Sequence, residues 1–286
     1  MKRILILFLP FLSLSIAAQD LHLSQYYTNH AMINPALVGD HIGDNTLTFN
    51  YRNQWAQINN PLHTTAFAYE RRFYNGLQEY QAGILFLNDQ FTPFSLNRFG
   101  LMLSFGLPLK LGKHRITPGI RGGIVLMNGD YSNRTHPNQW NYTIGEFDQN
   151  IASGEGTYNE AIQYPDLTLG FTHSMPLGQA HQLRWGYAIH HLNKPNITRL
   201  DNARLALRHT VHLGLELTFN DRFVMNPEGQ YSTTTGTDYL LAGSRVTFKQ
   251  AGSFYNGLFT GAYYRSNLEN EDALVPVFGI IFKTIQ

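Results

Sequence analysis

The chain has 286 residues and no cysteine, and its 21 basic and 20 acidic residues leave it almost neutral. The lack of cysteine excludes disulfides, thiolate metal ligands, thiol nucleophiles and a lipid-modified N-terminal cysteine. A scattered, balanced charge gives no reason to expect nucleic-acid binding. Aromatic residues make up 13% of the chain and glycine occurs 25 times, which favours β-structure.

Residues 1–18 have the features of a secretory signal peptide. Lys2 and Arg3 form a basic start, and an apolar run extends from Ile4 to Ile16 before small residues at the end. The run is shorter than the roughly 20 apolar residues that a membrane-spanning helix needs. We therefore expect export and cleavage near Ala18.

Residues 19–45 form a polar, irregular segment. Asn34 precedes a proline, which favours extended backbone and a turn at this point. The segment is too polar to cross a membrane. We expect it either to lie in the periplasm or to fold back as a plug.

From about residue 46 onward, apolar and polar residues alternate. The clearest stretches are 46–55, 182–189 and 210–219, where Leu, Phe, Tyr, Trp and Val oppose Thr, Asn, Gln, Arg, His and Glu. A period of two indicates β-strands. Strands of this length, apolar on one face and polar on the other, are typical of a membrane-spanning barrel with a wet lumen.

This alternation predicts twelve strands. They lie near residues 46–55, 64–74, 80–89, 96–109, 115–127, 165–176, 181–191, 208–219, 222–232, 237–248, 253–265 and 273–283. Pro118, Pro227 and Pro276 fall inside strands. We interpret them as local bends, because barrels curve through bulges and kinks.

The connections alternate between tight turns and mostly longer loops. Outer-membrane barrels have this asymmetry, with short periplasmic turns and long external loops. We therefore predict a closed antiparallel transmembrane β-barrel of about twelve strands over residues 46–286. Fourteen strands is the alternative, because further strands could lie within 128–164. A soluble or periplasmic β-protein is the competing fold.

The polar face of the strands predicts a charged lumen lining. The expected lumen residues are Arg121, Arg184, His212, Glu216 and Glu228. We expect the charged residues among them, together with Arg245, to pair with one another instead of performing acid–base chemistry.

The twelve histidines do not predict a metal or catalytic site. His190 and His191 are adjacent, so on a strand they would point to opposite faces. The same divergence separates His173 from Ser174, and the chain contains no G-x-S-x-G motif. We predict a protein that is not an enzyme and that has no cofactor and no metal.

The connection 128–164 is rich in aromatic residues among Asn, Gly, Gln and Thr. Such a composition suits a protein-binding surface. It equally suits a packed cap over the pore mouth, and both interpretations stay open.

Three motifs carry a resemblance to a known family. They are Ser24-Gln25-Tyr26-Tyr27, then Asn34-Pro35-Ala36-Leu37-Val38-Gly39, then Tyr51-Arg52-Asn53-Gln54-Trp55. In order and spacing they resemble the start of the PorP/SprF family of outer-membrane proteins of the type IX secretion system and gliding motility. A later stretch, His191-Leu192-Asn193-Lys194-Pro195-Asn196, is similar to a second family feature.

The resemblance implies a non-enzymatic barrel in the outer membrane of a Gram-negative, Bacteroidetes-like cell, embedded in lipid. It also implies that the barrel docks or anchors type IX secretion components, a secreted adhesin, or both. Residues that could contact such a partner are Gln25, Tyr26, Asn34, Pro35, Gly39, Arg52, Gln54, Trp55, Pro195 and Asn196.

Ordinary barrel chemistry also accounts for some of these residues. Arg52 and Gln54 could simply line the lumen, and Trp55 could belong to an aromatic girdle. A passive porin or small-molecule transporter is the alternative function, and an outer-membrane enzyme is the third hypothesis.

Overall fold

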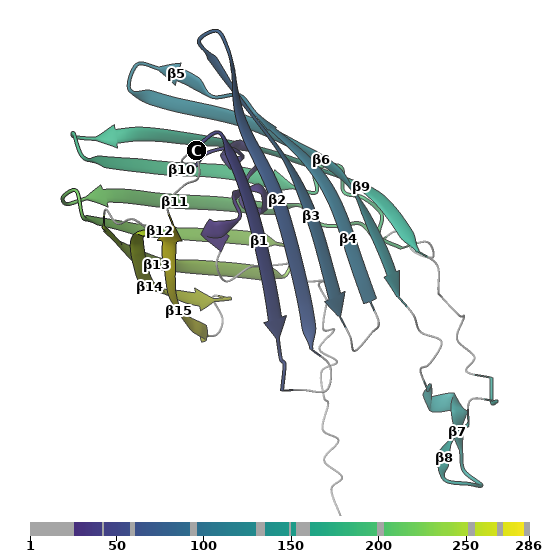
Figure 1. Cartoon of the computed structure of the whole chain (residues 1–286). Helices are drawn as coiled ribbons and strands as arrows, with labels where there is room; N and C mark the ends of the chain where they lie inside the picture. Colours follow the sequence, from purple (N-terminus) through teal and green to yellow (C-terminus); the bar gives the residue numbers. More distant parts are fainter. Residues whose placement is uncertain are drawn as a thin grey trace, which may run out of the picture.

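The protein is an all-β molecule with one large antiparallel sheet (Figure 1). The computed structural model describes residues 26–41, 43–57, 61–91, 96–129, 135–148, 150–152, 161–198, 203–250, 255–267 and 271–282. The strands of the sheet are β1 (Asn45–Gln54), β2 (Leu62–Asn75), β3 (Gln78–Phe91), β4 (Leu96–Gly106), β5 (Leu109–Leu111), β6 (His114–Gly129), β9 (Ile162–Leu177), β10 (His181–His190), β11 (Arg208–Thr218), β12 (Phe223–Thr234), β13 (Thr237–Lys249), β14 (Tyr255–Ser266) and β15 (Glu271–Phe282).

The sheet follows chain order from β1 to β15, and β5 pairs only with β6. All twelve expected strands are present, with ends within three residues of those predicted. The strand expected over 96–109 stops at Gly106 and resumes as β5, because Pro108 between them has no backbone N–H for the ladder. Pro227 also has a structural consequence: the β11–β12 pairing skips from Gly214↔Glu228 to Leu217↔Met225 around it.

The connection 128–164 contains two further strands, β7 (Trp140–Asn141) and β8 (Glu146–Phe147). They pair with each other in a separate two-stranded sheet, and an edge-on contact joins Trp140 to Phe147. These two strands therefore do not extend the main sheet.

The two faces of the sheet differ as the alternation predicts. On β1, Leu47, Phe49 and Tyr51 are exposed, whereas the even-numbered residues between them are half-buried. On β2, Ala66 and Ala68 are fully buried. Large apolar side chains therefore cover the outer face, and small or polar side chains cover the inner one.

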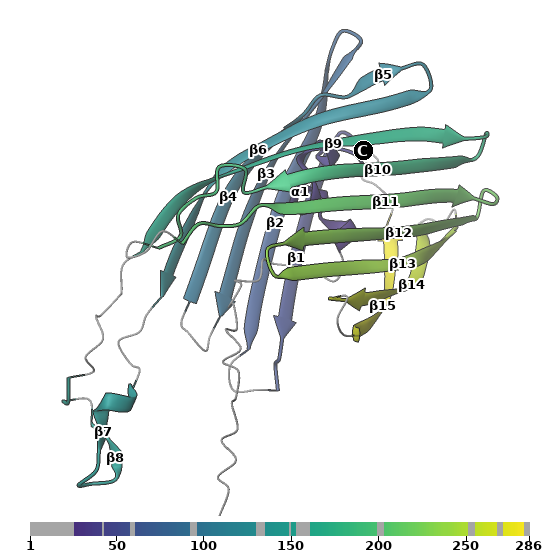
Figure 2. The same cartoon turned by 180° about the vertical axis from the view of Figure 1, so that it is seen from behind.

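The sheet curls around a short N-terminal segment, which we define as residues 26–41. It comprises η1 (Tyr26–Thr28), α1 (His30–Ile33) and η2 (Pro35–Leu37). Figures 1 and 2 view the molecule from opposite sides, and in both this segment lies between β1–β4 and β10–β13. Residues 26–41 are thus folded back against the inner face of the sheet.

Both hydrophobic clusters of the core depend on this segment. One cluster joins its Tyr27, Ile33 and Leu37 to residues of β13, β14 and β15, namely Tyr239, Leu241, Tyr263 and Val277. The other joins Ala31 to residues of β2, β3, β4, β6 and β9, namely Ala66, Ala68, Leu85, Met102, Val125 and Tyr164. The segment is therefore the centre of the fold.

No pairing joins β1 to β15 among the described residues, so the expected closure of the sheet into a barrel stays a prediction. In the same described residues, no helix has the length and apolar character needed to span a membrane.

Leu213 tests the assignment of the two faces. It is 53% exposed on the outer face. If this face meets lipid near the bilayer midplane, Leu213→Arg should lower the free energy of unfolding by roughly 2–4 kcal/mol. The measurement is a denaturant titration of the protein folded into phospholipid vesicles.

The matched control is Gln182→Arg, because Gln182 faces the inner side and lines a polar cavity there. Gln182→Arg should lower the free energy of unfolding clearly less than Leu213→Arg does. An equal or larger loss at Gln182 would show that the faces are reversed.

Candidate functional site

The N-terminal segment owes its local shape to an Asn-Pro pair. Asn34 has extended backbone angles (φ −154°, ψ 124°), as expected for a residue before proline. Pro35 begins the following turn of helix, where its missing N–H costs nothing. The side-chain oxygen of Asn34 accepts a hydrogen bond from the backbone N–H of Ala36 at 2.9 Å, which caps that turn.

Asn34 also joins the segment to the sheet. Its amide nitrogen donates to the backbone carbonyl of Phe171 at 3.0 Å and to that of Tyr187 at 3.2 Å. Nε2 of His212 lies 3.1 Å from the same nitrogen. These three residues belong to β9, β10 and β11, and Asn34 is fully buried. One amide therefore connects the segment to three neighbouring strands.

Glycines on the inner face make room for this contact. A Cβ at Gly170 would lie 2.2 Å from the side-chain oxygen of Asn34, and a Cβ at Gly119 would lie 2.4 Å from the backbone nitrogen of Ala36. Both distances are far below van der Waals contact, so any side chain at these positions would displace the segment.

The far end of the segment is held by a buried carboxylate. Gly39 has a positive φ of 74° and donates its N–H to Oε2 of Glu70 at 2.7 Å. Nε2 of His41 lies 2.8 Å from the same oxygen. The guanidinium of Arg72 donates to the carbonyl of Gly39 at 3.1 Å. Glu70 and Arg72 thus hold the last residues of the segment against β2.

The lumen charges pair differently from the prediction. Arg245 and Glu228 do pair with each other, at 3.0 Å. Arg184 instead contacts Asp40 of the segment at 3.1 Å, and Arg121 donates to the carbonyl of Ala31 at 2.6 Å. The prediction was wrong for these two arginines, because the folded-back segment brings its own acceptors to them.

Further contacts tie Arg121 and Arg245 into networks. Arg121 also donates to Oγ1 of Thr168 at 3.0 Å and lies 2.9 Å from Nδ1 of His190. The guanidinium of Arg245 lies 4.0 Å above the ring of Tyr27, which stacks on Tyr263. Polar and aromatic contacts therefore hold the segment at Ala31 and at Tyr27.

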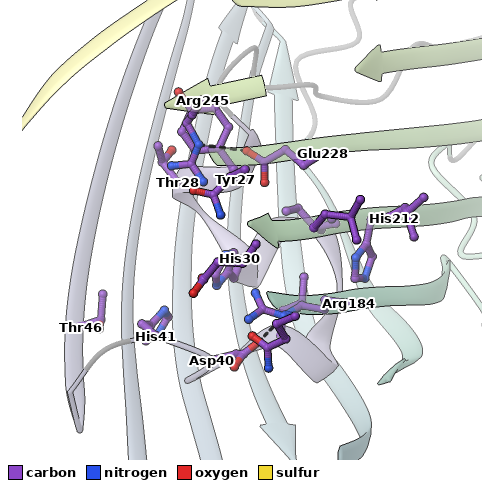
Figure 3. Close-up of a pocket in the computed structure, with 18 of the residues that line it drawn as sticks. Tyr27, Thr28, His30, Asp40, His41, Thr46, Arg184, His212, Glu228 and Arg245 are labelled. Atoms are coloured by element: carbon purple, nitrogen blue, oxygen red, sulfur yellow. Dashed lines mark hydrogen bonds and ion pairs between the residues drawn. The ribbon is translucent and has the colours of Figure 1, made fainter. Parts of the chain in front are cut away.

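A polar cavity of about 380 Å³ lies between the segment and the sheet (Figure 3). Thr46, Gln182 and Asn226 line it from the beginnings of their strands, so it lies toward the end of the sheet that carries the short connections. Glu216 and Glu228 also line it.

The charges in this cavity are largely balanced. Burial lowers the pKa of His30 to about 4, so its imidazole is neutral at pH 7. Burial acts to raise the pKa of Asp40, but Arg184 and other neighbours together hold it below its ordinary value. Asp40–Arg184 and Glu228–Arg245 are thus two neutralised pairs in one cavity.

The other predicted site residues lie in several places. Gln25 and the side chain of Tyr26 lie outside the described residues. Arg52 and Gln54 lie on the face of β1 that is turned toward the inner side of the sheet, and they are hydrogen-bonded to each other. Trp55, at the end of β1, is 52% exposed and has a positive φ of 60°.

The stretch that contains Pro195 and Asn196 folds back on itself. The carbonyl of Pro195 accepts a hydrogen bond from Leu205 N at 3.0 Å, and Asn196 forms an isolated bridge with Arg204. Leu205 and Ile197 pack against the core cluster that contains Ala31. This connection therefore adds to the core cluster that the N-terminal segment shares with the sheet.

His190 and His191 have separate partners. His190 lies beside Arg121, whereas Nδ1 of His191 contacts Asp166 at 2.9 Å. Across the part of the chain that the structure describes, no three or more His, Asp or Glu residues gather in a metal-binding arrangement.

Sequence reasoning missed Glu70, Arg72 and the two inner-face glycines. Gly119 and Gly170 occupy inward positions in long strands, where a glycine often marks a close approach of another backbone. That signal was available, because the two residues face each other in the β6–β9 register.

Gly119→Val should displace the segment without breaking the ladder, because the new side chain would occupy the position of Ala36. A cysteine placed at Ala36 should then react with a maleimide at least tenfold faster in the folded protein. Gly122→Ala is the control, since a Cβ there meets only Leu167, at 4.0 Å. Equal labelling rates in the two variants would contradict the described packing.

Comparison with known proteins agrees with the geometry. The model of one protein family, described as type IX secretion system membrane protein PorP/SprF, matches residues 15–286. The comparisons with curated proteins and with solved structures gave no match. Because the match covers nearly the whole chain, including the segment and every strand of the sheet, the protein belongs to the PorP/SprF family of type IX secretion system membrane proteins.

Proposed function

We propose that the sheet closes into an outer-membrane β-barrel whose lumen is filled by its own N-terminal segment. This barrel docks or anchors components or clients of type IX secretion, including a secreted adhesin, and performs no catalysis. The observation that carries the proposal is the buried attachment of Asn34 to β9, β10 and β11. A lumen filled in this way suits a docking protein better than a pore.

The outer face supports insertion in lipid. Near one end of the strands, the hydroxyl of Tyr51 lies 2.9 Å from Nδ1 of His63. Toward the other end, the indole N–H of Trp185 donates to Nδ1 of His173 at 3.0 Å. Amphipathic rings of this kind gather at the two interfaces of a membrane, with an apolar band between them.

The orientation follows from the connections. An even number of strands brings both chain ends to the side of the short turns, and the proposed signal peptide, residues 1–18, delivers the chain from the periplasm. The short turns then face the periplasm and the longer connections face outward. Closure is required in lipid, because an unpaired strand edge cannot be satisfied there.

The family motifs divide into two groups in this proposal. Asn34, Pro35 and Gly39 are buried and hold the segment in place. Trp55 and Asn196 are exposed and are therefore available for contact with a partner. The first group makes the filled barrel, and the second offers it to other proteins.

The alternative is a passive porin or small-molecule transporter, and the polar cavity of about 380 Å³ is the observation in its favour. The cavity is bounded by the segment, whose core clusters extend to strands on both sides. A continuous water path would need the segment to leave.

The two functions differ in conductance and in secretion. The purified full-length barrel in a planar bilayer should show no stable open channel, because the segment fills the lumen. Gly119→Val, which displaces the segment without breaking the ladder, should conduct, and cells that carry it should fail to display a type IX secreted adhesin. Outer-membrane insertion of both proteins is checked by heat-modifiable migration.

A large, stable conductance of the intact protein would contradict the proposal. So would normal secretion in cells that lack the whole gene. If such cells instead lose uptake of a solute, the transporter function replaces the one proposed.

A further inference from the structure

The β2–β3 hairpin projects beyond the rest of the sheet. The last residue of β2 that pairs with β1 is Arg71, and the last residue of β3 that pairs with β4 is Gln81. Residues 73–80 therefore have no third strand beside them, although β2 and β3 stay paired up to Asn75↔Gln78. Figures 1 and 2 both show this hairpin rising past its neighbours, next to the β5–β6 hairpin.

Arg71 marks where the membrane ends on β2. It is exposed on the same outer face as Phe67 and Tyr69. A cation on the lipid-facing side is costly at the bilayer midplane but nearly free at the interface. Arg71 therefore lies at the level of the headgroups, on the side of the short turns.

The tip of the hairpin lies above that level. Asn75 lies four positions beyond Arg71, about 14 Å of strand, or about 10 Å along the membrane normal at a usual strand tilt. One headgroup layer is only about 5–7 Å thick. Leu77, in the turn beyond Asn75, is thus placed past the lipid and in the periplasm.

Several of the projecting residues are nevertheless apolar. Phe73 and Tyr74 are exposed, and Leu77 is fully exposed, at 104%. Phe73 stacks on Tyr80 with ring centroids 5.6 Å apart. The neighbouring β5 adds Leu109 and Leu111, and the side chain of Gln78 joins the two hairpins by donating to the carbonyl of Pro108 at 2.9 Å. We call the exposed apolar residues within 73–80 and 109–111 the overhang patch, namely Phe73, Tyr74, Leu77, Leu109 and Leu111.

The charges around the overhang patch are basic. Lys110 and Lys113 are exposed at the tip of the β5–β6 hairpin. The one carboxylate between residues 71 and 80, Glu79, is held by Arg115 in two hydrogen bonds of 2.8 and 2.9 Å. A partner must therefore supply negative charge around an apolar centre.

We propose that the overhang patch docks a periplasmic protein through an apolar pocket bordered by carboxylates. The inference rests on the proposed function for the membrane orientation and adds the surface and the chemistry of the partner. Lipid does not reach Leu77 at this height, and an apolar patch that the described residues leave exposed to water marks a protein interface. Aromatic side chains at the centre and basic ones at the edge fit such an interface.

The test uses the full-length protein in its own cells, with a photo-crosslinking benzoylphenylalanine in place of Leu77. We expect one discrete protein adduct, whose yield falls at least tenfold when Lys110→Glu and Lys113→Glu are added to the same chain. Adducts to lipid alone, or a protein adduct whose yield is unchanged by the two charge reversals, would overturn the proposal.

A second measurement follows secretion of a type IX adhesin. Leu77→Asp should reduce its display at the surface at least tenfold. Phe219→Asp is the matched control, because Phe219 is also exposed, at 64%, in a short connection at the same end whose strands do not project. Heat-modifiable migration checks that both variants insert as folded barrels.

The outcomes separate this inference from the proposed function. If Leu77→Asp secretes normally while deletion of the gene stops secretion, the overhang patch is not the docking surface, but the proposed function stands. If deletion of the gene also leaves secretion intact, the proposed function itself fails.

Discussion

The fold depends on one constraint: the polar groups on the inner face of a curled sheet need partners, and the N-terminal segment supplies them. Arg121, Arg184 and Glu70 would each lose a hydrogen-bond or ion-pair partner if the segment left. Removing one partner of a buried charged group is costly, because the remaining group is left desolvated. The apolar clusters follow the same logic, since both include side chains from the segment. The segment is therefore as much a part of the core as any strand.

This arrangement separates the two tasks of the protein. The outer face meets the needs of lipid with an apolar band, and the inner face is occupied by the chain itself. In the proposed function, the two ends are open to other proteins: exposed motif residues such as Trp55 on the side of the longer connections, and the overhang patch on the side of the short ones. The filled barrel that we propose could hold proteins on both sides of a membrane without opening a path for small molecules. In the proposed function, its contribution to secretion is positional instead of catalytic.

The strands could be predicted from the sequence, whereas the position of the N-terminal segment against the sheet could not. A period of two is a local signal, so the strands and their two faces follow from neighbouring residues. Asn34 reaches Phe171 across 137 residues of sequence and His212 across 178, and no local pattern encodes such contacts. The Asn-Pro pair indicated only that the chain turns there. The inward glycines Gly119 and Gly170 did hold the missing information, because in a strand they mark a close approach of another backbone. The prediction that the lumen charges pair with one another was wrong for Arg121 and Arg184 for the same reason: their partners lie on the segment.

The most direct test is whether the N-terminal segment lies inside the membrane-inserted protein. A Cβ at Gly83 would lie 2.4 Å from Cγ2 of Val38, so Val38→Cys and Gly83→Cys place two sulfurs within reach of a disulfide. The natural chain has no cysteine, so these would be the only thiols. If the segment lies there, the two cysteines form a disulfide. Both cysteines of the protein isolated from outer membranes should then resist a maleimide reagent after denaturation until a reductant is added. Full labelling of both thiols without reductant, in a protein shown to be folded and inserted, would contradict it.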